Sequence, residues 1–273
     1  RYLDDGEGII YDYDSDGNNI RVHYPDGGCE RMFYDAAGNR IRHVMPESYD
    51  QEKDDGPGWT YTYDEEDRLT SVTGPDGVLQ SAWTYDAAGN PVTETDAEGR
   101  TTFRTWTAYG ELEELLRPAK EQDGEILYER TTWTYDLTGN LICEQRHGGY
   151  WSQESRLLET EGQGLTLCFF YDKRNRRIRA EDGTGAVVCW QYDVQGKPVR
   201  EERAISEDMR QVFHYSYDRA GHLTEIREEL DNGLSAAEGD RKYAVTRYRY
   251  DENGNRTEII TPEGYRILRG YDA

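Results

Sequence analysis

Residues 85–92 read Tyr-Asp-Ala-Ala-Gly-Asn-Pro-Val, and this stretch recurs with small changes along almost the whole chain. Each copy has a tyrosine, here called the anchor, then an aspartate, and a glycine four residues after the anchor. Successive anchors lie between 21 residues apart (Tyr13 to Tyr34) and 36 residues apart (Tyr135 to Tyr171). Such a period is typical of a repeat array built from small structural units. Seven copies keep all three residues: Tyr13, Asp14 and Gly17; Tyr34, Asp35 and Gly38; Tyr85, Asp86 and Gly89; Tyr135, Asp136 and Gly139; Tyr192, Asp193 and Gly196; Tyr217, Asp218 and Gly221; Tyr250, Asp251 and Gly254.

Three degenerate copies show what the glycine position requires. Asp67 and Asn175 replace the glycine in the copies that begin at Tyr63 and Tyr171, and the copy at Trp106 keeps its glycine. Aspartate and asparagine are the non-glycine residues that best tolerate a left-handed backbone. The aspartate after the anchor is suited to accept backbone N–H groups and hold a turn closed. We therefore predict a positive φ at Gly17, Gly38, Gly89, Gly139, Gly196 and Gly254.

Aromatic residues alternate before each turn, as in Trp59, Tyr61 and Tyr63. Period-two alternation of this kind is typical of a half-buried strand. An aliphatic residue returns after the turn, and a second glycine-containing turn follows, for example at 74–77 and 182–185. Each unit is thus predicted to be strand, turn, strand, turn. We predict an all-β chain with less than about 10% helix, a long antiparallel meander that coils into a spiral because an open sheet rarely exceeds about ten strands.

Insertions separate some of the units, at 43–58, 117–125, 147–164, 204–209 and 230–242. All are polar, and we predict elongated loops on one rim of the sheet, with a helical turn at 234–239. No break between them indicates a domain boundary, so residues 1–273 are predicted to form a single repeat array of about ten units, truncated at both ends.

Composition limits the function classes. The chain has 55 acidic and 32 basic residues and a formal net charge of −23. Such a charge excludes a phosphate-binding surface for nucleic acid and disfavours docking on anionic membranes, and no apolar run is long enough for membrane insertion. With 22 tyrosines and 6 tryptophans the chain is too aromatic for a disordered protein. The scarcity of aliphatic residues argues against the thick core of a compact enzyme, and we expect no cofactor.

Four groups of residues are candidate chemical sites. Asp12, Asp14 and Asp16 match the start of a calcium loop, but His23 stands where a bidentate glutamate is required, so a plain turn is favoured over a metal site. The repeated aspartates are turn caps rather than catalytic residues, because an active site is singular. The acidic clusters at 54–55 and 65–67 are predicted to be solvated loops. Cys168 and Cys189 occupy equivalent positions with one strand between them, which favours two free thiols over a disulfide.

The copies resemble the YD repeats of the RHS family, which includes bacterial polymorphic toxins, Tc-toxin C components and teneurins. The resemblance runs from Tyr11 to Tyr271. It implies a spiralling β-sheet that closes into a hollow shell, which in bacterial members encloses a C-terminal toxin. In the family, a core segment with an aspartate self-cleavage site follows the repeats. This sequence contains no such segment, so we expect the chain to be part of the shell wall only.

The expected function is that of a non-enzymatic structural module that encloses or presents a toxin or another polypeptide, in contact with the remainder of its own parent chain. The resemblance suggests a secreted, delivered or cell-surface protein. The alternative is a carbohydrate- or receptor-binding module, in which exposed rings stack on sugars; we favour rings that pack against each other. Edge strands near Ile9–Tyr13 and Tyr265–Tyr271 predict self-association that increases with salt.

Overall fold

The computed structural model describes residues 8–159, 162–206, 209–230 and 242–271. Within these ranges the backbone is β-strand and turn, apart from one 3₁₀ turn at Pro46–Ser48. The prediction of an all-β chain is confirmed. The segment 234–239, predicted to form a helical turn, lies outside the described residues. None of the helical structure in the described ranges is long and apolar enough to cross a membrane.

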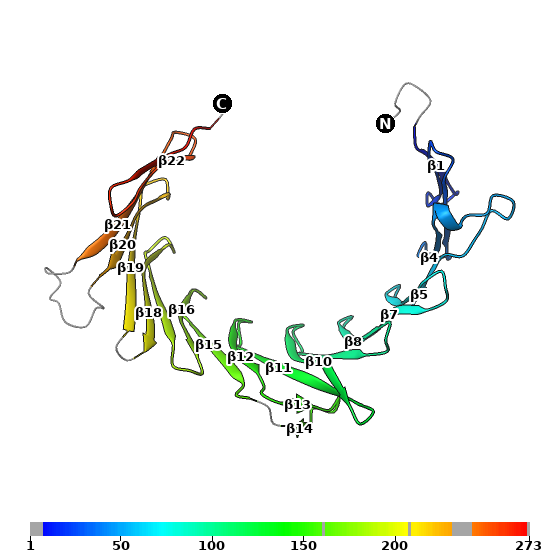
Figure 1. The fold of residues 1–273 in the computed structure, drawn as a ribbon, viewed down its shortest axis with the longest axis horizontal. Helices are drawn as coiled ribbons and strands as arrows, with labels where there is room; N and C mark the ends of the chain where they lie inside the picture. The colour runs from blue at the N-terminus through cyan, green and yellow to red at the C-terminus, as the bar shows by residue number, and fades with distance from the viewer. Residues whose placement is uncertain (1–7, 160–161, 207–208, 231–241, 272–273) are drawn as a thin grey trace. The chain divides into compact units, whose positions relative to one another are not determined.

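The chain divides into two compact units, each made of several repeats. The first is Arg1–Thr131 with Gly148–Gly162, and the second is Thr132–His147 with Gln163–Ala273. The strands of the first unit pair antiparallel with their neighbours in chain order from β1 to β10, and Figure 1 shows them in blue to green. This unit contains β1 (Ile10–Tyr13), β2 (Asn19–His23), β3 (Cys29–Tyr34), β4 (Arg40–Val44), β5 (Trp59–Tyr63), β6 (Leu69–Thr73), β7 (Leu79–Tyr85), β8 (Pro91–Asp96), β9 (Thr101–Trp106), β10 (Leu112–Gln122), most of β11 (Glu125–Tyr135), β13 (Tyr150–Trp151) and β14 (Leu157–Glu159).

The second unit is a meander of the same kind. Its pairing runs from β12 to β15 and then through each strand in turn to β23. It contains the end of β11, β12 (Leu141–Arg146), β15 (Leu165–Tyr171), β16 (Arg177–Asp182), β17 (Val187–Tyr192), β18 (Pro198–Ser206), β19 (Met209–Tyr217), β20 (Leu223–Glu229), β21 (Tyr243–Tyr250), β22 (Arg256–Ile260) and β23 (Arg266–Leu268).

A β-bulge stands at the same place in eight copies of the repeat. Tyr217 pairs with Leu223, whereas the preceding residue Ser216 pairs with Glu225, so Thr224 is left without an opposite residue. The same shift occurs directly before Tyr13, Tyr34, Tyr63, Tyr85, Tyr171, Tyr192 and Tyr250. A bulge bends its strand and increases the local twist. Each of these copies therefore adds the same local bend to its sheet.

Two of the five insertions, 117–125 and 204–209, prolong strands and a third contains short strands, which corrects the prediction of loops for them. The segment 117–125 lies mostly in β10 and β11, which run to a tight turn at Asp123 and Gly124 with φ of 53° and 81°. Two successive positive φ values are typical of the type I′ hairpin, which an Asp-Gly pair favours. The segment 147–164 contains β13 and β14, and Trp151 of β13 pairs with Tyr128 of β11.

Few side chains of this structure are fully buried, because no second layer covers the strands of either compact unit (Figure 1). Val44 has no exposed surface and Leu116 is 2% exposed, but most strand residues are half-buried. Among the described residues the buried apolar side chains are Val22, Cys29, Met32, Val44, Leu116, Leu127, Tyr128 and Val212. Stability must therefore depend on the strand ladders and on contacts that recur in every unit.

Each of the predicted edge strands pairs on one side only within the described residues. β1 pairs with β2, and β23 pairs with β22. Ile10 is 62% exposed and Leu268 is 73% exposed. Unpaired strand edges with apolar side chains are sites at which another strand can add. The predicted edge strands are therefore present, whereas the predicted association stays a prediction.

Candidate functional site

The anchor side chains tie each unit to the one before it. The hydroxyl of Tyr217 donates a hydrogen bond to the backbone oxygen of Pro198 at 2.9 Å, and that of Tyr250 donates to Leu223 at 2.9 Å. Each acceptor lies six residues after the preceding anchor. The same bond is made by Tyr34, Tyr63, Tyr85, Tyr171, Tyr192 and Tyr271, to Asn19, Arg40, Leu69, Leu141, Arg177 and Arg256 respectively.

The acceptor residue lies directly before the bulged residue, which explains why this bond recurs. A bulge interrupts the strand ladder, so backbone groups beside it need partners from outside the ladder. The tyrosine hydroxyl supplies such a partner. In the degenerate copy at Trp106, the indole nitrogen donates instead, to the oxygen of Pro91 at 2.9 Å. The position therefore requires a ring that carries a hydrogen-bond donor at its far end.

The aspartate after the anchor caps the turn, as the sequence predicts. In the copy at Asp136, Oδ1 accepts the backbone N–H groups of Thr138 at 2.8 Å and Asn140 at 3.0 Å. The bond from the fourth residue after the aspartate recurs at Asp14, Asp35, Asp64, Asp86, Asp172, Asp193, Asp218 and Asp251. Thr107 replaces the aspartate in the Trp106 copy, and its hydroxyl accepts the N–H groups of Tyr109 and Glu111.

The glycine position has the predicted backbone. Gly139 has a φ of 81°, and the substitutes Asp67 and Asn175 have φ of 60° and 58°. Positive φ values also occur at Gly17, Gly38, Gly89, Gly196, Gly221 and Gly254. The N–H of this left-handed residue donates to the backbone oxygen three residues earlier, which belongs to the aspartate, or to Thr107 in the Trp106 copy, and so closes the turn.

The residue after the glycine was not singled out by the sequence, and it proves to be part of the same device. Where it is asparagine, its amide donates to Oδ2 of the capping aspartate, as Asn140 does to Asp136 at 2.9 Å. Where it is Arg68 or Arg176, the guanidinium binds its own aspartate and also donates to the backbone oxygen of the next turn's aspartate, Asp86 or Asp193. The recurring asparagine in this position was the signal that could have revealed the role.

Cationic groups cover the aromatic rings, which corrects the expectation that rings pack mainly against each other. The residue after the glycine lies over the next anchor: Arg176 is 4.7 Å from the ring centre of Tyr192, and Lys197 is 5.1 Å from that of Tyr217. His222 stacks on Tyr250 with ring centres 4.7 Å apart. Rings elsewhere on the strands are covered in the same way, including Tyr61, Phe169, Phe213 and Tyr248. Stacked cations of this kind stabilise by about 0.5–1 kcal/mol at exposed sites.

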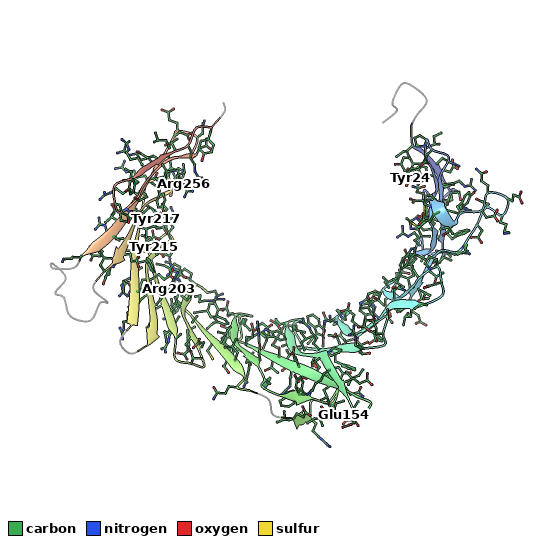
Figure 2. The ribbon with its side chains drawn as sticks, in the orientation of Figure 1. Tyr24, Glu154, Arg203, Tyr215, Tyr217 and Arg256 are labelled. Atoms are coloured by element: carbon green, nitrogen blue, oxygen red, sulfur yellow. The ribbon has the colours of Figure 1, made fainter. Side chains whose placement is uncertain are left out.

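One fully paired polar cluster surrounds Tyr215 in the second unit. Its hydroxyl donates to Glu201 at 3.1 Å, and Glu201 also binds Arg203, which lies over Phe213. Burial and the neighbouring Glu201 raise the pKa of Tyr215 to about 12. Figure 2 labels Tyr215, Tyr217 and Arg203 in this part of the structure. Each polar group here has a protein partner, which is typical of a structural contact rather than a reactive group.

The aspartates matched to a calcium loop are engaged elsewhere. Asp12 accepts from His23 at 2.9 Å and from Arg21 at 3.4 Å, and Asp14 caps its turn through Asp16 and Asn18. In the part of the chain that the structure describes, no three acidic, histidine or cysteine side chains are grouped as metal ligands would be.

The acidic pair at 54–55 lies in a loop and is partly exposed, as predicted, but its carboxylates are paired, which the sequence did not reveal. Asp54 accepts from Arg21 at 2.5 Å, Arg31 at 3.3 Å and Tyr49 at 2.7 Å. Asp55 is paired with Arg42 at 2.8 Å. The segment 43–58 thus packs back on β2, β3 and β4 through these carboxylates. In the cluster at 65–67, Asp67 accepts from Asn39 and Glu66 pairs with Arg68.

The cysteines are placed partly as predicted. β16 separates Cys168 from Cys189, since Cys168 is opposite Glu181 and Cys189 is opposite Arg179, and both thiols are free. The sequence did not reveal that Cys168 lies directly opposite Cys143 of β12.

Acid should destabilise the protein through the turn caps. Hydrogen bonds from Asn140 and Thr138 lower the pKa of Asp136 to about 2, below its ordinary value of 3.8. A depressed folded-state pKa means that the ionised cap stabilises the fold above about pH 4 and that this contribution is lost as the pH falls toward 2. We expect the denaturation midpoint of the wild type to fall steeply in this window. Asp136→Asn should reduce that dependence by the share of this one cap, as followed by urea melts between pH 2 and pH 6.

The matched control for this variant is Glu252→Gln. Glu252 lies within the turn that begins at Asp251, and its carboxylate has no hydrogen-bond partner among the described residues. This variant should keep the pH dependence of the wild type. A flat profile in the wild type would contradict the assignment of the aspartates as ionised caps.

Comparison with known proteins agrees with the repeat. The RHS Repeat family model matches residues 54–79 and 63–101. The resemblance inferred from the sequence is thereby confirmed: residues 54–101 are similar to RHS repeats. Double-stranded DNA deaminase toxin A of Burkholderia cenocepacia strain H111 is 34% identical over 127 residues, which cover 41% of this chain and 8% of that protein.

Solved structures of Tc toxin proteins are also similar to this chain, at low sequence identity. The crystal structure of TcdB2-TccC3 without its hypervariable C-terminal region is 14% identical, covers 93% of this chain and 18% of that one, and has a TM-score of 0.29. The Photorhabdus luminescens Tc holotoxin pore is 15% identical, with coverage of 93% and 18% and a TM-score of 0.27. The chain spans less than a fifth of the length of each of these proteins.

Proposed function

We propose that this chain is a non-enzymatic wall segment of an RHS-type shell, and that the wall encloses or presents a toxin or another polypeptide. The observation that carries the proposal is the tie from each anchor to the preceding unit, made at the same register position by eight tyrosines and one tryptophan. A side chain that recurs from repeat to repeat has a role common to these repeats, which is to hold neighbouring repeats together. Catalysis requires instead one constellation of unlike residues.

The exposure of the sheet supports a role as a wall. Its strands leave most side chains half-buried, and no layer of this chain covers either face of the strands that the structure describes. A single layer presents far more surface per residue than a compact enzyme domain does. Such a surface suits contact with another polypeptide, or with the rest of the parent chain. The deaminase activity in the name of the Burkholderia relative belongs to a protein of which this chain covers 8%, and it is not part of the proposal.

The second candidate function, a carbohydrate- or receptor-binding module, would need ring faces open to a ligand. Guanidinium groups lie over many of these rings, with Arg177 4.2 Å from the ring centre of Phe169. A groove of about 580 Å³ in the first unit is lined by Glu94, Arg104 and Arg117 among other residues, none of them aromatic. Sugar-binding sites depend on exposed ring faces for stacking, so these contacts favour the wall over the binding module.

Protection from proteolysis tests enclosure. The polypeptide that contains this chain is expressed whole and digested with a protease of broad specificity, and the surviving segments are identified by mass spectrometry. A segment outside the repeats should survive in the wild type. It should become cleavable when the wall is loosened by the combined changes Tyr192→Phe, Tyr217→Phe and Tyr250→Phe, which remove three ties.

The control is Tyr248→Phe, which changes a tyrosine on the same strand as Tyr250 whose hydroxyl has no hydrogen-bond partner among the described residues. Protection should be unchanged in this variant. If the segments outside the repeats are cleaved equally fast in the wild type and in the triple variant, enclosure must be given up. Saturable binding of this chain to an array of glycans would then favour the carbohydrate-binding module.

A further inference from the structure

Cys143 and Cys168 form the closest pair of thiols in the described part of the chain. They lie directly opposite each other on the antiparallel strands β12 and β15, and their sulfur atoms are 3.5 Å apart. Residues opposite each other in antiparallel strands have Cα atoms about 4.5 or 5.5 Å apart, and disulfides span Cα distances of about 4.4–6.8 Å. The backbone is therefore already at the right spacing, and the sulfur atoms need to approach by about 1.5 Å through side-chain rotation to reach the bonded distance of about 2.05 Å.

This position is the one at which neighbouring units face each other throughout the array. It joins the eighth residue after one anchor to the third residue before the next. Glu225 and Arg247 occupy it three repeat units further on and form an ion pair at 2.8 Å. Between them, Arg179 is opposite Cys189 and Arg200 is opposite His214. Among these pairs, Cys143 and Cys168 place two thiols where another copy places a cross-strand ion pair.

We propose that Cys143 and Cys168 are a redox-active dithiol that closes to a cross-strand disulfide and locks β12 to β15. The oxidant is a low-molecular-weight disulfide such as oxidised glutathione. One protein thiolate attacks a sulfur of that disulfide, forms a mixed disulfide and releases one glutathione thiolate. The second protein thiolate attacks the protein sulfur of the mixed disulfide and releases the second glutathione. The two protein thiols together lose two electrons and two protons, and the small disulfide takes up both the electrons and the protons and leaves as two thiols. The inference holds whether or not the chain encloses a polypeptide.

The surroundings of the pair determine how fast it closes. Burial and the neighbouring Cys168 thiol raise the pKa of Cys143 to about 11, so little of this thiol is ionised at neutral pH. Because the thiolate is the attacking species, closure should be slow near pH 7 and should accelerate as the pH rises toward that pKa. Brief exposure to an oxidant near pH 7 should therefore leave the dithiol reduced, whereas sustained oxidising conditions should close it.

A closed bond would restrain the longest interval between anchors, from Tyr135 to Tyr171. The connection between β12 and β15 runs through β13 and β14, which belong to the first unit. Linking residues 143 and 168 closes a loop of about 25 residues in the unfolded chain, which lowers its conformational entropy. We expect the oxidised chain to unfold at a temperature about 5 °C higher than the reduced chain.

The experiment incubates the purified chain in buffers of defined ratio of reduced to oxidised glutathione, blocks the remaining thiols with an alkylating agent, and maps disulfides by non-reducing peptide mass spectrometry. The wild type should lose two hydrogen atoms and yield a peptide that links residues 143 and 168, with a raised melting temperature that a dithiol reductant reverses. Cys189→Ser should behave as the wild type does, because Cys189 is opposite an arginine. Cys143→Ser should form no link.

Two results would overturn the proposal. One is glutathione attached to Cys143 or Cys168 at full oxidation with no peptide that links them, since a correctly placed second thiol would displace it. The other is a link that uses Cys189 or Cys29 as often as Cys143. Both outcomes are read from the wild-type peptide map, so they remain decisive even if a serine variant folds poorly.

Discussion

Replacing Gly139 by valine is expected to lower the free energy of unfolding by about 2 kcal/mol, because valine must adopt a φ that its branched side chain resists. Gly139 has a φ of 81°, and its N–H donates to the oxygen of Asp136 at 3.1 Å to close the turn. The chain cannot relieve the strain by changing φ without breaking this bond. Urea denaturation followed by circular dichroism gives the change directly.

Gly139→Asn is the matched control, and the chain itself supplies the reason. Asn175 occupies the same position of its own copy with a φ of 58°. Asparagine tolerates this conformation, so the variant should lose less than about 1 kcal/mol. Equal losses for valine and asparagine would mean that the volume of the side chain matters rather than the backbone, and the requirement for positive φ would be refuted.

Removing one anchor hydroxyl is the second change with a large expected effect. Tyr250→Phe deletes the donor to the backbone oxygen of Leu223 but keeps the ring that stacks on His222. The carbonyl beside the bulge is left without this partner, at a cost of about 1 kcal/mol. Tyr192→Phe and Tyr217→Phe act on other acceptors, Arg177 and Pro198. The three changes together should therefore cost about 3 kcal/mol if independent ties add.

Tyr248→Phe distinguishes the hydrogen bond from a general effect of losing a hydroxyl. Tyr248 is two residues from Tyr250 on β21, and Arg256 lies 5.3 Å from its ring centre. Its hydroxyl makes no hydrogen bond within the described ranges, so the change should be within about 0.5 kcal/mol. If it destabilises as much as Tyr250→Phe does, the anchors act through ring burial alone, and the tie between units has no energetic importance.

The sequence predicted the features that depend on residues close together in the chain. The period, the strand before each turn, the capping by Asp136 and the left-handed backbone at Asn175 all follow from a window of about ten residues. Those interactions are set by local geometry, which side-chain type and spacing define well. The same window also contained Asp123 and Gly124, whose turn joins β10 to β11, and here the polar composition concealed a hairpin.

Contacts between units could not be predicted in the same way. The bond from Tyr171 to Leu141 joins residues 30 apart, and Cys143 and Cys168 are 25 apart, across an insertion of irregular length. Sequence spacing does not show which residues such an insertion brings together. The aliphatic residues after the turn illustrate a second limit: Ile41 and Ile178 suit a buried face, yet both stand at the bulge and are 38% and 37% exposed.

The register at which neighbouring copies pair has a consequence for the gene. Tyr135 and Tyr171 are 36 residues apart and Tyr171 and Tyr192 are 21 apart, yet Cys143 meets Cys168 at the same register as Arg179 meets Cys189. The number of residues in a connection therefore does not change the register at which the following strands pair. Duplication, loss or exchange of a whole unit, or splicing of a foreign segment between two strands, leaves the neighbouring hairpins in place. A coding sequence of this kind can change its length by recombination within single repeats while its product keeps folding.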